Sequence, residues 1–223
     1  MFALLLPVKQ FSRSKQRLVG WLTPEERATL AAAMFEDVWD TLRTSCRQYP
    51  LFVISSEPKV IALCRAEAVP CLVETEQRSH SESVIEATRW AMSQGVSTLL
   101  SVPIDTPAVT AEEIATLTEL SRQSDVIVVP SADGTGTNAL LRTPPDAIAP
   151  RFGPGSCELH VAQARAKGLS HRVHRVDGLA ADIDTPEDVE RFLALDHSTK
   201  LPSRTAKLLR QWTEARRGVA ICS

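Results

Sequence analysis

The sequence predicts a single α/β domain with three layers, in which helices cover both faces of a mostly parallel sheet. Short apolar runs rich in Val, Ile and Leu alternate with helix-type segments along most of the chain, and the links between them are short. At 223 residues the chain is long enough to bury a full core, and its 43% hydrophobic and 23% charged residues are ordinary for a globular protein.

Seven short apolar runs have the length and composition of buried strands. We expect them at residues 2–6, 51–54, 71–74, 98–102, 126–129, 138–142 and 171–176. The chain begins with only six apolar residues, and no basic residue precedes them. This start is therefore expected to be a core strand and not a signal peptide or a membrane span.

Helix starts are marked by hydroxyl caps, prolines and acidic first turns. The run Thr23-Pro24-Glu25-Glu26 predicts a helix that continues to about residue 44, and apolar residues at i+4 spacing give it one buried face. Further helices are expected over 59–68, 83–95 and 156–167, and after the starts Thr110-Ala-Glu-Glu113 and Thr185-Pro-Glu-Asp188.

The end of the chain differs from the rest. We expect a domain over residues 1–195 and a basic C-terminal tail or docking helix over 196–223, with one helical stretch around 208–212. A solvated basic helix is the plain interpretation of this segment. A contact with a partner or with a second copy in a homodimer is the alternative.

The overall charge limits the classes of partner. A formal net charge of -2 gives no reason to expect nucleic-acid binding, and no long apolar run predicts a membrane partner. The five cysteines form no CxxC pair, so we expect reduced thiols in a cytoplasmic protein. The partners that remain are small molecules.

Aspartates follow the predicted strands at three places. Asp105 comes directly after a buried run and stands between two prolines, and Asp182 and Asp184 are two residues apart. Carboxylates at the carboxyl edge of a parallel sheet suit a hard cation such as Mg²⁺. Each aspartate could also be an ordinary turn or cap residue. If residues 182–184 are extended, both side chains point to one face and repel each other unless a cation lies between them.

Two glycine loops predict an anion-binding site. The runs Asp133-Gly-Thr-Gly-Thr-Asn138 and Phe152-Gly-Pro-Gly-Ser156 hold four of the nine glycines, and hydroxyl residues follow them. Ser156 also begins a predicted helix, where a phosphate would meet free N–H groups, although an ordinary capping serine has the same geometry.

Three cations, Lys9, Lys15 and Arg17, lie in the loop after the first strand, where they could neutralise a triphosphate. A solvated basic turn is the alternative. His160, one turn into the predicted helix, is more often structural than catalytic in such a place. Since no Ser-His-Asp order or Cys-His pairing stands out, nucleophilic catalysis is disfavoured.

The chain resembles a known family in six motifs spread over roughly residues 1–195. They are Leu6-Pro-Val-Lys9 with Ser14-Lys15-Gln-Arg17-Leu18, Leu22-Thr-Pro-Glu-Glu-Arg27, Asp105-Thr-Pro, Asp133-Gly-Thr-Gly-Thr-Asn-Ala-Leu-Leu141, Phe152-Gly-Pro-Gly-Ser156 with His160, and Asp182-Ile-Asp-Thr-Pro-Glu-Asp188. The set resembles the CofC/FbiD guanylyltransferases of coenzyme F420 biosynthesis. The resemblance implies a fold similar to the MobA-like nucleotidyltransferases and transfer of GMP from GTP to 2-phospho-L-lactate, phosphoenolpyruvate or 3-phosphoglycerate, with release of pyrophosphate.

The resemblance also implies roles for particular residues. The catalytic set would be Asp105, Asp182 and Asp184, which would hold one or two Mg²⁺ ions, with Lys15 on the GTP phosphates. The acid would be bound by Thr137, Asn138, Gly153 and Ser156. The nucleotide would be held by Pro7, Val8, Lys9, Lys15 and Arg17.

One segment departs from the family pattern. Where the family commonly has a Gly/Asp-Leu-Asn-Ala-Ala helix start, this chain has Arg78-Ser-His-Ser-Glu-Ser83, and Cys157 stands where a large apolar residue is frequent. We expect the altered pocket to accommodate an additional hydroxyl, as in 3-phosphoglycerate. The competing hypotheses are a cytidylyltransferase of the same fold and a non-catalytic subunit that binds phosphometabolites.

Overall fold

The computed structural model of this protein describes residues 1–45, 48–76, 78–199 and 203–220. Its centre is a seven-stranded sheet in the order β3-β2-β1-β4-β6-β5-β7. The strands are β1 (Phe2–Val8), β2 (Leu51–Ser55), β3 (Cys71–Val73), β4 (Thr98–Ser101), β5 (Val126–Pro130), β6 (Thr137–Arg142) and β7 (His171–Val173). Every predicted strand is present.

The sheet is mostly parallel, as predicted. Strands β3, β2, β1 and β4 run parallel, and so do β5 and β7, whereas β6 is antiparallel to both of its neighbours. The register pairs Pro130 at the end of β5 with Thr137 at the start of β6. The carboxyl ends of β1, β4 and β5 and the beginning of β6 therefore lie at one edge of the sheet, where ligands bind in folds of this kind.

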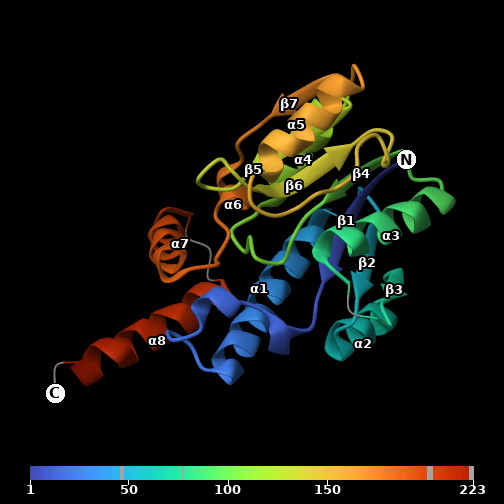
Figure 1. Ribbon diagram of the computed structural model, residues 1–223. Coiled ribbons are helices and arrows are strands. Elements are labelled where there is room, and N and C mark those ends of the chain that lie inside the picture. Colours follow the sequence, from blue (N-terminus) through green and yellow to red (C-terminus); the bar gives the residue numbers. More distant parts are fainter. Residues whose placement is uncertain (46–47, 77, 200–202, 221–223) are drawn as a thin grey trace.

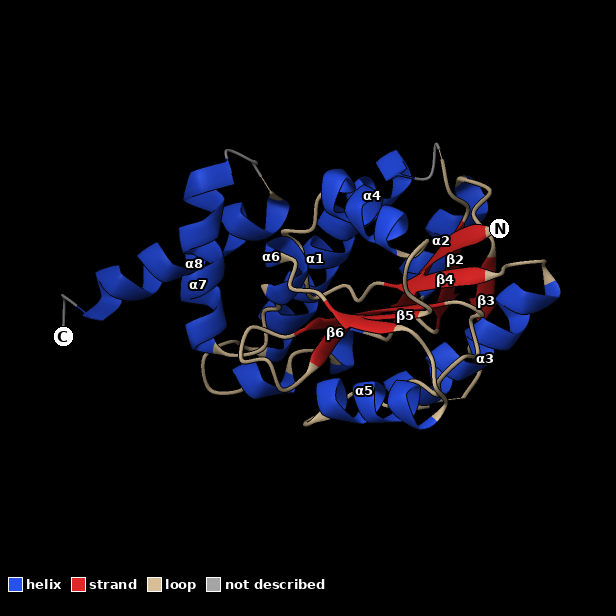
Figure 2. Ribbon diagram, turned by 90° about the horizontal axis from the view of Figure 1, so that it is seen from above, coloured by secondary structure: helices blue, strands red, loops and turns tan. Residues whose placement is uncertain are grey.

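Helices cover both faces of the sheet and give the three predicted layers (Figure 2). The helices are α1 (Pro24–Ser45), α2 (Pro58–Ala66), α3 (His80–Ser93), α4 (Ala111–Leu120), α5 (Ser156–Ala166), α6 (Asp177–Ala180), α7 (Pro186–Thr199) and α8 (Arg204–Ala220). Among the described helices, none has both the length and the apolar character needed to cross a membrane.

Alternating side chains of β1 explain why the two faces are both covered. Leu4 and Leu6 belong to the apolar cluster that includes residues of α1, α2 and α4, whereas Ala3 and Leu5 belong to the cluster that includes residues of α3. Successive residues of a strand point to opposite faces, so an uninterrupted apolar strand requires a helical layer on each side.

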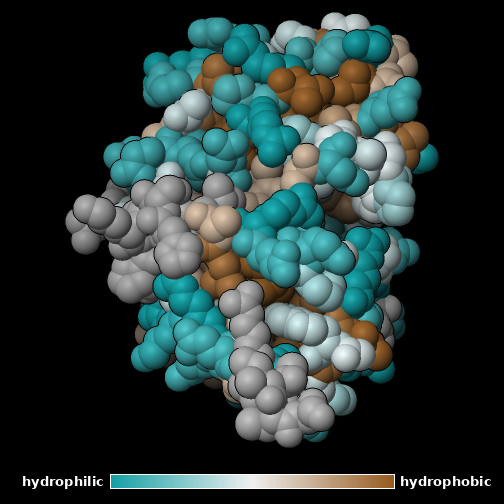
Figure 3. Space-filling view, turned by 90° about the vertical axis from the view of Figure 1, so that its left-hand side faces the viewer, coloured by the Kyte–Doolittle hydropathy of each residue, from teal (hydrophilic) through white to brown (hydrophobic). Residues whose placement is uncertain are grey.

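The basic segment at the end of the chain packs as a helix against α1 (Figure 1). The carboxylate of Asp37 accepts hydrogen bonds from the backbone N–H groups of Arg204 and Thr205 at 3.0 and 2.9 Å. The Arg216 guanidinium donates to Glu26 at 2.8 Å. The outer surface on this side is largely hydrophilic, with smaller apolar areas between the polar groups (Figure 3). The division of the chain at residue 195 stays a prediction.

Several predicted boundaries differ from those of the structure, among them the end of β1, which runs to Val8 and not to residue 6. Two of the differences have a local reason. Helix α3 begins at His80 and not at residue 83, because Ser79 and Glu82 form a capping box that starts the helix earlier. Strand β7 ends at Val173 and not at residue 176, because Val176 is already the N-cap of the short helix α6.

Candidate active site

A cavity of about 600 Å³ opens at the edge of the sheet where β1, β4 and β5 end. Its volume is in the range of small-molecule sites. Seven residues predicted for the site line it: Arg17, Asp105, Thr137, Asn138, Gly153, Asp182 and Asp184. The topology therefore brings together groups that are up to 167 residues apart in the sequence, from Arg17 to Asp184.

Lys15 lies between two of the aspartates. Its Nζ is 3.2 Å from Asp105 Oδ2 and 2.9 Å from Asp184 Oδ1, and its side chain is only 5% exposed. Burial alone would lower the pKa of Lys15, but the two carboxylates outweigh it and raise that pKa above its usual value. Burial would likewise raise the pKa of Asp184, and Lys15 and Arg17 reverse this. The ammonium group is thus firmly charged and fixed behind two of the carboxylates that line the cavity.

Asp182 has a different environment from Asp105 and Asp184, because in the described structure it forms no ion pair with Lys15. Burial raises its pKa to about 6, and the negative charges of Asp105, Asp184 and Asp188 add to the effect. A hydrogen bond of 2.9 Å from the Asn138 amide opposes the rise in part. Negative charge is therefore in excess at this end of the cavity, even with Lys15 in place.

The chemistry of these donors fits a magnesium ion. Mg²⁺ prefers carboxylate oxygens, and the raised pKa of Asp182 indicates that its carboxylate lacks a cationic partner. Within the described residues, however, no three acidic, cysteine or histidine side chains are gathered in a form that could hold one metal ion. The ammonium of Lys15 occupies the position between Asp105 and Asp184.

Of the residues predicted to hold the nucleotide, Pro7 and Val8 are the last two residues of β1, and Lys9 follows them. Lys9 Nζ lies 3.0 and 2.9 Å from the two carboxylate oxygens of Glu74, and it also contacts the hydroxyl of Ser83. The Glu74 side chain is 2% exposed. Sequence reasoning missed Glu74, since a lone glutamate after a short strand carries no local signal.

The first glycine loop is organised by the carboxylate of Asp133. It accepts hydrogen bonds from the Ser131 hydroxyl at 2.6 Å and from the Thr135 N–H and hydroxyl at 3.0 and 2.9 Å. These bonds, that of Ser131 foremost, lower the pKa of Asp133 to about 2. At Gly136 a Cβ atom would lie 2.8 Å from Ser131 Oγ, so a side chain there would have to displace the Ser131 hydroxyl, which accepts from the Gly136 N–H and donates to Asp133.

The second glycine loop leads into α5. Gly155 is the N-cap residue, with φ of 71° in the left-handed region, and Ser156 is the first residue of the helix. The Ser156 hydroxyl is fully buried and has no hydrogen-bond partner among the described groups. Gly153 lines the cavity, whereas Ser156 lies outside its lining.

The rings of two histidines pack against Phe152 in the second glycine loop. His80 lines the cavity, and its ring meets the Phe152 ring edge to face at 4.7 Å. The Phe152 N–H donates to the Ser81 hydroxyl at 2.9 Å. His160 is fully buried on α5, 5.6 Å from the Phe152 ring. The segment that departs from the family pattern thus contacts the second glycine loop and reaches the cavity, as the prediction of an altered pocket requires.

A comparison with solved structures confirms the fold. The chain superposes on a protein from Desulfovibrio desulfuricans G20, provisionally assigned as a nucleotide-diphospho-sugar transferase, with a TM-score of 0.78, 17% sequence identity and 97% coverage of both chains. The likeness shows that this chain has the same α/β fold, with its cavity at the carboxyl edge of the mostly parallel sheet.

Comparison with known sequences identifies the family to which this chain belongs. The family described as "Guanylyl transferase CofC like" matches residues 2–210. A phosphoenolpyruvate guanylyltransferase of Sphaerobacter thermophilus is 36% identical over 188 residues, which cover 84% of this chain and 90% of the relative. A 3-phospho-D-glycerate guanylyltransferase of Colwellia psychrerythraea is 30% identical over 192 residues, which cover 86% and 90%. The chain belongs to the CofC-like guanylyl transferase family, and it is an enzyme of the transferase class.

Proposed function

We propose that this enzyme transfers GMP from GTP to the phosphate of a three-carbon phospho-acid and releases pyrophosphate. One observation carries the proposal: two kinds of group converge on a single cavity. The carboxylates of Asp105 and Asp184, which hold the Lys15 ammonium, line the same cavity as the hydroxyl and glycine groups of the two loops. This combination suits a reaction between a triphosphate and a smaller anion.

The proposed reaction is a direct displacement. An oxygen of the acceptor phosphate attacks the α-phosphorus of GTP, and the bond from that phosphorus to the bridging oxygen of pyrophosphate breaks in line with it. The attacking phosphate is already anionic at neutral pH, so no general base is needed. This agrees with the absence of a Ser-His-Asp or Cys-His arrangement in the sequence.

The main barrier is the repulsion between two anions. At about 4 Å it amounts to about 4 kcal/mol per pair of unit charges in a partly dry site. Lys15 and Arg17 are the cations of this chain that we assign to the triphosphate, with the loop of Pro7, Val8 and Lys9 beside it. Mg²⁺, held by Asp105, Asp182 and Asp184 when bound, supplies further neutralisation of the phosphates and of the leaving pyrophosphate.

We assign the phospho-acid to the opposite end of the cavity. Thr137 and Gly153 line it there, and α5 directs its N-terminus toward the same loop. The unpartnered hydroxyl of Ser156 supports a role in binding an anion. Asn138 donates to Asp182 and to the Leu179 carbonyl, so we assign it the task of holding Asp182.

The lining of the cavity favours an acceptor with a hydroxyl group. His80, Asp133 and Thr135 add polar groups to its wall. 3-Phosphoglycerate carries a hydroxyl that phosphoenolpyruvate lacks, and a polar site rejects a substrate that leaves its groups unpaired. Faster turnover of 3-phosphoglycerate than of phosphoenolpyruvate and 2-phospho-L-lactate supports this assignment, and equal rates contradict it.

The test is pyrophosphate release with GTP, Mg²⁺ and each of the three acids in turn. We expect release only when nucleotide, acid and metal are all present. Turnover with CTP and not GTP would establish a cytidylyltransferase, and binding without pyrophosphate release would establish a non-catalytic subunit. Because the product is an unstable anhydride, a coupled enzyme that consumes it sharpens the measurement.

We place this reaction in coenzyme F420 biosynthesis, in the cytoplasm, where GTP and phosphorylated three-carbon acids are available. Detection of the coupled product in extracts supports this placement. The homodimer stays a prediction that light scattering on the purified protein tests directly.

A further inference from the structure

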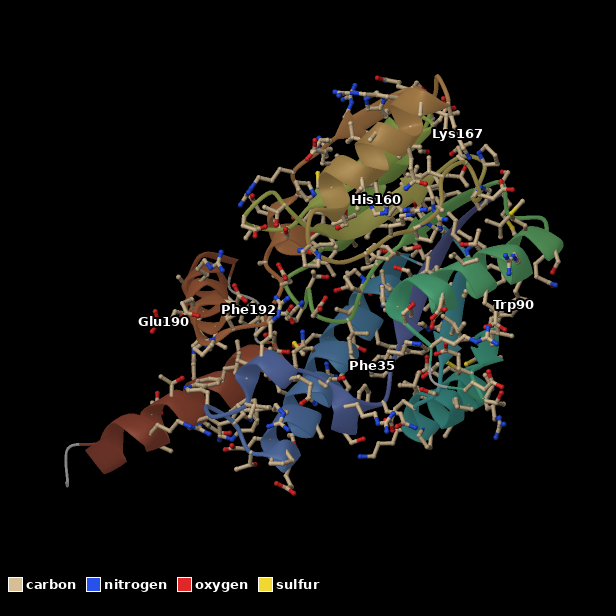
Figure 4. All side chains as sticks on the ribbon, viewed as in Figure 1. Phe35, Trp90, His160, Lys167, Glu190 and Phe192 are labelled. Carbon is tan, nitrogen blue, oxygen red and sulfur yellow. The ribbon has the colours of Figure 1, made fainter. Side chains whose placement is uncertain are left out.

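His160 lies on α5 (Figure 4). It is a buried imidazole with both ring nitrogens engaged. Its Nδ1 lies 3.0 Å from the hydroxyl oxygen of Thr137, and its Nε2 lies 2.8 Å from the backbone nitrogen of Arg151. The ring is fully buried, and Phe152 packs against it with ring centroids 5.6 Å apart. Neither nitrogen is exposed to solvent, so protein groups alone decide which of them carries the proton.

The contact with Arg151 decides this. A backbone N–H can only donate, so Nε2 must offer its lone pair and carries no proton. In a neutral imidazole the proton then resides on Nδ1. A doubly protonated ring is excluded, because its Nε2–H would face the Arg151 N–H. Burial, together with the buried Arg142 guanidinium, lowers the pKa of His160 to about 4, so the ring is neutral at physiological pH.

The proton on Nδ1 fixes the role of the Thr137 hydroxyl. Nδ1–H donates, so Thr137 Oγ1 accepts, and the hydroxyl proton of Thr137 must point away from His160. Thr137 lines the cavity. We propose that His160 is a positioning residue, which holds Thr137 as an obligate hydrogen-bond donor toward an anionic oxygen of the phospho-acid.

This inference rests on the proposed function, because it concerns the acid end of the same cavity. An ordinary threonine hydroxyl rotates and can donate or accept. A hydroxyl that already accepts from Nδ1–H has its proton directed away from His160 and donates into the cavity without reorganisation, which suits an anion. Ser156 stands four residues before His160 on α5, on the same helix face, and its buried hydroxyl has no partner in the described structure.

The tautomer is measured directly by NMR on the wild-type protein, whether or not it turns over. In a sample with ¹⁵N-labelled histidine, long-range proton–nitrogen spectra distinguish the Nδ1–H, Nε2–H and doubly protonated forms. The signals of His160 are assigned by comparison with His160→Gln. At pH 7 we expect Nδ1–H. Finding Nε2–H or the doubly protonated form overturns the inference, while absence of pyrophosphate release by the wild type would refute the proposed function and not the tautomer.

Two variants separate the two hydrogen bonds of His160. In His160→Asn, the amide nitrogen takes the place of Nδ1 and can still donate to Thr137. In His160→Gln, the amide oxygen reaches the place of Nε2 and can still accept from Arg151, but Thr137 loses its donor. We expect His160→Gln to raise the KM for the acid about tenfold, with the KM for GTP unchanged, and His160→Asn to keep the acid KM within about threefold of wild type.

A double-mutant cycle with Thr137→Val shows whether His160 acts through Thr137. Thr137→Val raises the acid KM, and adding His160→Gln to it is expected to raise that KM no further. An equal rise in both backgrounds, or equal effects of His160→Asn and His160→Gln, overturns the inference. Thr118→Val, which removes a buried hydroxyl bonded to the Ile114 carbonyl of α4, is the matched control and leaves the acid KM unchanged.

Discussion

The two ends of the cavity are built from different interactions. On the nucleotide side, Lys9 and Lys15 are each held by buried or half-buried carboxylates at 2.9–3.2 Å. On the acid side, the contact between Thr137 and His160 joins two neutral groups in a fully buried setting. Under the proposed function, the difference teaches that charge is placed where a large, highly charged substrate would bind, and hydrogen-bond direction where a small one would be oriented.

The largest effect is expected on the charged side, from Asp105→Ala. Removing this carboxylate takes away a proposed metal ligand and one partner of Lys15, and we expect kcat to fall about 10²–10³-fold. The Asp105 side chain is 30% exposed, so the fold should survive. Pyrophosphate release measures the rate, and circular dichroism checks the fold. A variant that keeps near-full activity contradicts the assignment of this end of the cavity.

Lys15→Met tests the second charge on the same side. It keeps the length of the side chain but removes the ammonium, and it leaves Asp105 and Asp184 to repel each other. We expect kcat/KM for GTP to fall about 10- to 100-fold, while the KM for the acid changes less. Arg13→Ala, an exposed cation of the same loop, is the control. Equal losses of kcat/KM in the Lys15 and Arg13 variants would show that the position of the positive charge in this loop does not affect the reaction with GTP.

The neutral side predicts a pH dependence of stability. The pKa of His160 is lowered to about 4 in the folded protein, and it is close to 6.5 when the chain is unfolded. The unfolded state therefore binds the proton first as the pH falls, so stability is full above pH 6.5 and declines toward pH 4, by on the order of 3 kcal/mol. Urea unfolding from pH 7 to pH 4 measures this. In His160→Gln the part of the decline that is due to this residue disappears, and an unchanged slope would contradict the prediction.

The smallest effect is expected at the pair of Lys9 and Glu74. Glu74→Ala removes the carboxylate that accepts from both Lys9 and Ser83 and leaves the Lys9 ammonium without a counter-charge, and we expect a loss of about 1–3 kcal/mol in the free energy of unfolding. The double variant Lys9→Met with Glu74→Ala should recover part of this loss, because the unpaired ammonium is gone. Urea unfolding at pH 7 gives the four values of the cycle. If the two single changes in the free energy of unfolding simply add up in the double variant, Lys9 and Glu74 do not stabilise each other, and the prediction is contradicted.

Much of the fold could be predicted from short stretches of sequence. Thr23-Pro24-Glu25-Glu26 and the capping box at Thr110 start helices where expected, because caps and first turns act within four residues. The same kind of signal was present at Ser79 and Glu82, and it explains why α3 begins earlier than predicted. The guanylyltransferase motifs identified the family for the same reason: each is a local run of residues.

Partners that lie far apart along the chain could not be predicted in this way. Lys15 and Asp184 are separated by 169 residues, and Lys9 and Glu74 by 65. The sequence placed Lys15 on phosphates and Asp184 on a metal, and it gave no sign that the two side chains contact each other. His160 carried no pattern that distinguished a positioning role from a structural one, because its partners Thr137 and Arg151 come from β6 and a loop.

The sequence by itself therefore determined which elements form, which edge of the sheet receives the aspartates and glycine loops, and which family the chain resembles. These depend on periodicity, capping and turn chemistry, which are short-range. Only the tertiary structure decided that Lys15 stands between two carboxylates, that α8 closes on α1 and that the proton of His160 lies on the side of Thr137. Such contacts arise when the order of strands brings distant segments together, and burial then leaves their polar groups no partner except one another.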